Sequence, residues 1–163
     1  MMHRQQFYHV VRLFAVLAIV VGGTVAAVPR VQAATSPVRV PAGAEWVNTG
    51  ILVAQGQAVY LDTQGVAITA PLKWYPGAIS GPDGQVWNLG CGEYQGAPPP
   101  CALDHAPYGA LVGRVGQYGD PFMIGGASSV TPPASGTLYL AVNDNLGSYS
   151  DNLAGFTVSF SGE

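Results

Sequence analysis

The sequence predicts an all-β protein: an antiparallel β-sandwich, jelly-roll-like, forming a single domain after a cleaved signal peptide. Several short stretches alternate apolar and polar residues with a period of two, which is the pattern of half-buried strands. No stretch keeps a helical period, and 22 glycines and 13 prolines would interrupt one. Many short strands separated by turns, in a chain of this length, are typical of sandwiches and jelly rolls.

Residues 1–33 are expected to be the signal peptide. The basic residues Arg4 and Arg12 precede an apolar run at residues 13–28, and "VQA" then fits the small-residue rule for signal peptidase. The alternative is a membrane anchor, but the run is shorter than the ~20 residues that a spanning helix needs. We therefore expect a secreted or periplasmic protein with no membrane insertion after cleavage.

The chain after this segment is acidic. It contains three basic and nine acidic residues. Three cations cannot neutralise a phosphate backbone, so the composition argues against nucleic-acid binding, and equally against an anionic lipid surface. The acidic surface of the protein suits a divalent cation instead.

Residues 34–45, which include two prolines, are expected to form a short lead-in, and residues 46–163 to form the domain. In "AVYLDTQG", Val59 and Leu61 fall on one face of a strand. "GALVGRVG" and "PFMIGG" are short apolar runs bounded by glycine and are further strands. "GTLYLAVND" and "GFTVSFSG" alternate most clearly. Their expected inward residues are Leu138, Leu140 and Val142 in the first, and Phe156, Val158 and Phe160 in the second.

A long loop rich in glycine and proline, residues 70–107, interrupts the strands. It holds the turn "GPDG" and both cysteines of the chain, Cys91 and Cys101. In an exported protein such a pair is expected to form a disulfide. A zinc site is the alternative, but it needs four ligands and the loop offers too few soft donors.

The last two strands are expected to form a hairpin whose tip is crowded with oxygen-bearing side chains. Asp144, Ser148, Asp151 and Asn152 supply hard oxygen donors within nine residues. Calcium takes six to eight such oxygens and tolerates irregular geometry, whereas magnesium requires a stricter octahedron. The pattern therefore indicates a Ca²⁺ site, although a solvated turn rich in Asn and Asp remains the alternative because both residues are common in turns.

The stretch "GTLYLAVNDNLGSYSDNLAGFTVSF" resembles the C-terminal hairpin of the PA-IL-like lectins, small bacterial proteins that bind galactose through calcium. The shared features are an apolar strand, Asn-Asp, a turn with glycine, an Asp/Asn-Asn pair, Gly-Phe and a final alternating strand. Upstream, Trp46 with "TGILV", "GQAVYLDTQG", "GPDG", "GALVGRVG" and "PFMIGG" resemble earlier strands and turns of the family. The resemblance spans residues 46–161.

The resemblance implies a ligand set for calcium. Asp144 would be the acidic ligand at the strand end, Ser148 would offer its backbone carbonyl, and Asp151 and Asn152 would give side-chain oxygens. Asp151 departs from the family, which has Asn there. A further carbonyl is expected near Thr69.

The resemblance also implies a sugar site at the same ion. In the family, calcium coordinates two neighbouring sugar hydroxyls, and Asp144, Asp151 and Asn152 would hydrogen-bond the same hydroxyls. The backbone of Asn145 would contribute as well. Asn88 or Gln95 would replace a His and a Gln that the family uses to contact the sugar. The implied partner is a galactoside or another sugar with vicinal hydroxyls, and the resemblance also implies a homo-oligomer.

Enzymatic activity is not expected. A glycosidase needs two carboxylates across a cleft, whereas Asp144 and Asp151 sit on one turn and would share the ion. No nucleophile motif is present. The alternative to a lectin is a structural or adhesive β-sandwich that calcium stabilises without binding a small sugar.

Overall fold

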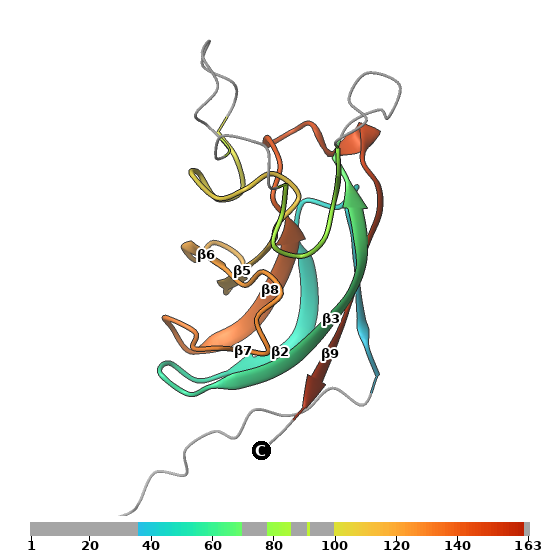
Figure 1. The fold of residues 1–163 in the computed structure, drawn as a ribbon. Coiled ribbons are helices and arrows are strands. Elements are labelled where there is room, and N and C mark those ends of the chain that lie inside the picture. Colours follow the sequence, from blue (N-terminus) through green and yellow to red (C-terminus); the bar gives the residue numbers. More distant parts are fainter. Residues whose placement is uncertain (1–35, 70–77, 86–90, 92–99, 162–163) are drawn as a thin grey trace, which may run out of the picture.

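The computed structural model describes residues 36–69, 78–85, 91 and 100–161, and these form two antiparallel sheets that face each other (Figure 1). This confirms the predicted β-sandwich. The first sheet has the order β1 (Val38–Pro41), β9 (Leu153–Ser161), β3 (Val59–Ile68) and β4 (Ile79–Ser80), with β7 (Ser129–Val130) also paired to β3. The second has the order β2 (Val47–Val53), β8 (Gly136–Val142), β5 (Leu111–Val115) and β6 (Pro121–Met123).

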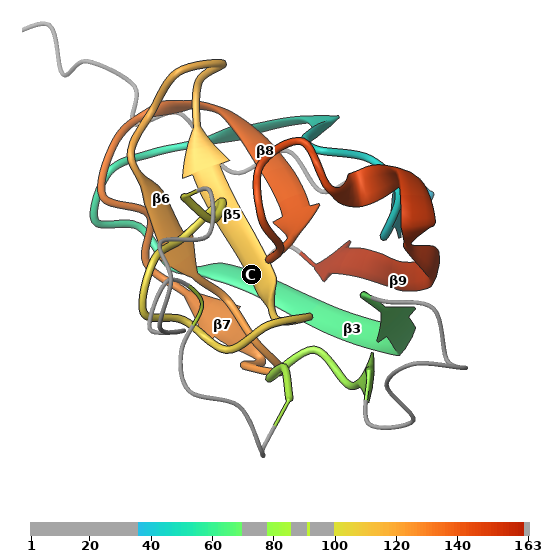
Figure 2. The same cartoon turned by 90° about the horizontal axis from the view of Figure 1, so that it is seen from above.

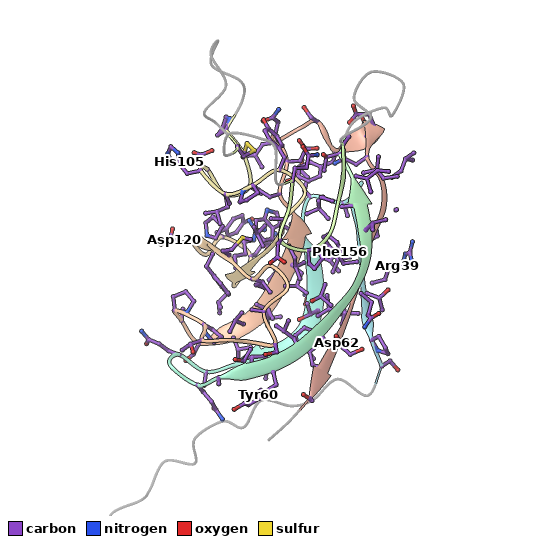
Figure 3. The ribbon with its side chains drawn as sticks, viewed as in Figure 1. Arg39, Tyr60, Asp62, His105, Asp120 and Phe156 are labelled. Carbon is purple, nitrogen blue, oxygen red and sulfur yellow. A yellow bond between two sulfur atoms is a disulfide. The ribbon has the colours of Figure 1, made fainter. Side chains whose placement is uncertain are left out.

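The core lies between the sheets, and the alternation of the sequence positions it. Leu61 pairs in register with Phe160 across β3 and β9, and both side chains are buried. Phe156 is fully buried and lies between the two layers, whereas Arg39 projects outward (Figure 3). Leu138, Leu140 and Val142 of β8 are all fully buried from the opposite sheet. The inward faces predicted for these strands are therefore confirmed.

The prediction that the last two strands form a hairpin is wrong. β8 pairs with β2 and β5 in one sheet, whereas β9 pairs with β1 and β3 in the other. Their connection therefore crosses from one layer to the next (Figure 2). Facing sheets lie ~10 Å apart, and a ten-residue connection spans that gap, whereas hairpin loops usually have two to five residues. We refer to this connection, residues 143–152, as the arch.

The expected lead-in contributes a strand to the sandwich. Its β1 pairs with β9 over four residues, and Val40 is fully buried in the core. The packed domain thus begins before Trp46. The main chain of β1 passes close to Gly155 of β9, whose φ is 136°. A Cβ atom on Gly155 would overlap the carbonyl oxygen of Val40 and lie 2.8 Å from the backbone nitrogen of Ala42.

Within the described part of the chain, η1 (Tyr149–Asp151) is a short 3₁₀ helix in the arch, and no helix there is long and apolar enough to cross a membrane. The expected signal peptide lies outside the described residues.

Candidate functional site

The arch folds back on itself so that Asp144, its second residue, contacts Asn152, its last. The N–H of Ser148 donates to the carbonyl of Asn145 at 3.0 Å and closes a turn. Gly147 allows that turn because its φ of +86° lies in the left-handed region. The helix η1 follows, and the N–H of Asn152 donates to the carbonyl of Tyr149 at 3.2 Å. These local bonds bring the end of β8 next to the start of β9.

Asp144 and Asn152 form the centre of the site. Asn152 Nδ2 donates to Asp144 Oδ2 at 2.8 Å, and the N–H of Asn145 donates to Asp144 Oδ1 at 2.7 Å. Asn152 Nδ2 also donates to the carbonyl of Ala42, just after β1, at 3.1 Å. Asp144 and Asn152 are only 3% and 7% exposed. The structure thus joins two of the predicted ligand residues across the two sheets.

The carboxylate of Asp144 lies in an unfavourable electrostatic environment. Burial raises its pKa, the hydrogen bonds from Asn152 and Asn145 oppose that change, and the negative charge of Asp151 raises the pKa further. Among the described residues, Asp144 forms no ion pair with a basic side chain. A buried carboxylate is costly unless a cation or a proton neutralises it.

The side-chain oxygen of Asn152 has unused bonding capacity. Asn152 Oδ1 is buried and accepts no hydrogen bond from any described residue. Buried polar atoms are nearly always satisfied, so an orphaned carbonyl oxygen beside a buried carboxylate needs an explanation. Both atoms are hard oxygen donors of the kind that Ca²⁺ takes, and the residues present therefore fit that ion.

Three further predicted ligands lie on the segments that adjoin this pair in the chain or in the sheet. Asp151 is exposed at the end of η1, close enough for its charge to act on Asp144. Ser148 precedes η1 and is partly buried. Thr69 directly follows the last rung of β3, where Ile68 pairs with Leu153, so the sheet register places it opposite Asn152. Its N–H donates to the carbonyl of Ala78 at 3.2 Å.

The described residues hold no group of three or more acidic, histidine or cysteine side chains that could bind a metal. The donors at the arch are two carboxylates, amide oxygens and main-chain carbonyls. Coordination here would depend on the amide and carbonyl oxygens as much as on Asp144 and Asp151.

Sequence reasoning gave no role to Asn143, which fixes the other side of the arch. It is fully buried, and its side chain hydrogen-bonds the main chain of residues 100–110, which we call the flanking segment. Asn143 Oδ1 accepts from the N–H of Leu103 at 2.8 Å, and Nδ2 donates to the carbonyls of Leu103, Ala106 and Pro107 at 3.0, 3.1 and 3.2 Å. The sequence signal that could have indicated this role is a polar asparagine directly after the apolar strand that ends at Val142.

The predicted disulfide between Cys91 and Cys101 is confirmed, with the two Cα atoms 6.0 Å apart. Its Cys101 Sγ lies 3.1 Å from Oδ1 of Asn145 in the arch, and the same oxygen accepts a hydrogen bond from the Tyr108 hydroxyl at 2.9 Å. The side chain of Asn145 therefore faces the flanking segment, and its N–H faces Asp144. Asn88 and Gln95, the expected sugar contacts, lie outside the described residues.

No protein-family model matches this chain, and neither does any curated protein. Among solved structures, the chain is similar to the N-terminal domain of EclA, which is described as a PllA-like lectin. The two share 24% sequence identity with a TM-score of 0.56, and the match covers 78% of this chain and 96% of the other. At this identity the likeness shows that the two share a fold.

Proposed function

We propose that this protein is an exported, calcium-dependent carbohydrate-binding protein, a lectin, and that it has no enzymatic activity. The observation that carries the proposal is the pair of buried groups at the arch: among the described residues, the Asp144 carboxylate has no basic partner and Asn152 Oδ1 has no hydrogen-bond donor. A divalent cation would neutralise the first and occupy the second. The fold shared with a lectin domain supports the same reading.

Ca²⁺ held at the arch would accept two vicinal sugar hydroxyls in its remaining coordination positions. The exposed Asp151 would lie at the solvent side of the ion, where it could accept hydrogen bonds from the same hydroxyls. Galactose-type sugars are the proposed ligands because the arch sequence resembles that of the galactose-binding family. One small sugar contributes little binding energy, so tight binding would need several sites, as in a homo-oligomer.

A second function is favoured by the position of the arch between the layers. Asp144 follows a strand of one sheet, and Asn152 precedes a strand of the other. An ion bound by both would cross-link the sandwich, as expected for a calcium-stabilised structural or adhesive module. This function requires the ion but no sugar.

Calcium binding is tested first, by calorimetric titration of metal-free protein with calcium chloride. We expect one site per chain in the wild type and none in Asp144→Asn. The matched control is Asp62→Asn, which makes the same exchange at an exposed residue of β3 and should leave binding unchanged. A wild-type protein that binds no calcium at millimolar concentration would contradict both functions.

Sugar binding is then tested on a glycan array with calcium and with chelator. Binding to terminal galactosides that chelator reverses supports the lectin. An array without binding, together with a melting temperature that falls in chelator, supports the structural module instead.

A further inference from the structure

The flanking segment pairs with the arch next to its proposed metal ligands. The N–H of Ala102 donates to the carbonyl of Asp144 at 3.0 Å, and the N–H of Leu146 donates to the carbonyl of Pro100 at 2.9 Å. Between these bonds, Cys101 and Asn145 form an isolated antiparallel bridge. The main chain on both sides of Asn145 is therefore fixed by the two residues that flank a disulfide cysteine.

The side chain of Asn145 is held from the same direction. Its Oδ1 accepts from the Tyr108 hydroxyl at 2.9 Å and lies 3.1 Å from Cys101 Sγ and 3.9 Å from Cys91 Sγ. A disulfide sulfur carries no hydrogen, so the two sulfur contacts are packing contacts. The Tyr108 hydroxyl is the donor that orients this amide.

Cys91 connects this contact to a second part of the flanking segment. Its N–H donates to the carbonyl of Ala106 at 2.8 Å, and the N–H of His105 donates to the carbonyl of Cys91 at 2.7 Å. Both cysteines are buried, at 0% and 6% exposure. The disulfide thus joins residues 105–106 to the strand-like pairing at Cys101, and both are linked to the arch.

We infer that the Cys91–Cys101 disulfide and Tyr108 are positioning groups for the calcium site, which they hold in place through Asn145. The connection is short, because the N–H of Asn145 is the donor that orients Asp144 Oδ1, at 2.7 Å. A constrained Asn145 fixes the carboxylate before the ion arrives, so less ordering is required on binding. This inference rests on the proposed function, because it concerns the same site.

The sharpest test is Tyr108→Phe, which removes one hydroxyl and leaves the ring. We expect its calcium affinity, measured by calorimetry on metal-free protein, to be about threefold to tenfold weaker, as for the loss of one hydrogen bond. Tyr118→Phe makes the same exchange at a tyrosine that is 88% exposed and should not change the affinity. The double variant Cys91→Ser with Cys101→Ser should weaken the affinity by at least as much.

A purely structural role is separated by a core variant. Val59→Ala removes two methyl groups from a fully buried residue at the other end of β3. It should lower the melting temperature and leave the calcium affinity unchanged, whereas Tyr108→Phe should change the affinity in chains that remain folded. Wild-type affinity in Tyr108→Phe and in the double variant overturns the inference and leaves the proposed function intact. A wild type that binds no calcium overturns both.

Discussion

Replacing Asn143 by alanine should destabilise the protein more than the small size of the asparagine side chain suggests. The side chain is fully buried, and all of its hydrogen bonds to described residues are to main-chain groups of the flanking segment. Its amide has two hydrogens for three carbonyl oxygens, so it supplies about three full hydrogen bonds, counting the one accepted from Leu103. At about 1 kcal/mol net for each bond, the loss is about 3 kcal/mol.

The assay is urea denaturation of metal-free protein followed by circular dichroism. For a domain of this size, 3 kcal/mol corresponds to a fall in melting temperature of about 10 °C. Asn143→Leu keeps the number and branching of the side-chain heavy atoms but removes every polar atom: it should be as unstable as the alanine variant. Asn48→Ala removes two solvent-exposed hydrogen bonds, to Tyr139 and Gly50, and should cost less than about 1 kcal/mol. A loss below about 1 kcal/mol in Asn143→Ala, or wild-type stability in Asn143→Leu, would refute the reasoning.

Three further predictions concern burial around the arch. Burial raises the pKa of Asp144 above its ordinary 3.8, so its ionisation costs folding stability as the pH rises through the raised pKa. The melting temperature of Asp144→Asn, relative to the wild type, should therefore increase between about pH 3 and pH 7 in metal-free buffer; a constant difference would contradict this. Val40→Ala should cost about 2 kcal/mol in urea denaturation, and the exposed Val66→Ala almost nothing; equal losses would mean that β1 is not in the core. Gly155→Ala should greatly lower the melting temperature because its Cβ would overlap β1, whereas Gly56→Ala, at φ +75° in open space, should cost only about 1 kcal/mol.

The parts of the fold that could be predicted are the strands whose own sequence pattern indicates which face is buried. Phe156, Val158 and Phe160 alternate with polar residues, so their inward direction follows from the period alone. β1 could not be found this way, because four residues that end in Pro41 give too short a pattern.

The pairing of each strand with its neighbours could not be predicted from the alternation of residues. β8 and β9 are consecutive and both alternate, which suggested a hairpin, but alternation is equally compatible with strands in facing sheets. Only the whole topology decides between these arrangements.

The candidate site likewise has residues that the local sequence indicated and residues that it did not. Asp144 and Asn152 are brought together by bonds within one short stretch, so local residue types indicated both. Asn143 and Tyr108 act through bonds to residues 36 to 40 positions away along the chain, and no local pattern contains these contacts.

The antiparallel pairing of β1 with β9 has a practical consequence. Val38, at the start of β1, pairs with Val158, whereas the arch joins the beginning of β9. The start of β1 and the end of β9 therefore lie side by side, at the end of the sandwich opposite the arch (Figure 1). Immobilising the protein on a sensor chip through a tag at either terminus should thus leave the arch facing the analyte, whichever terminus carries the tag.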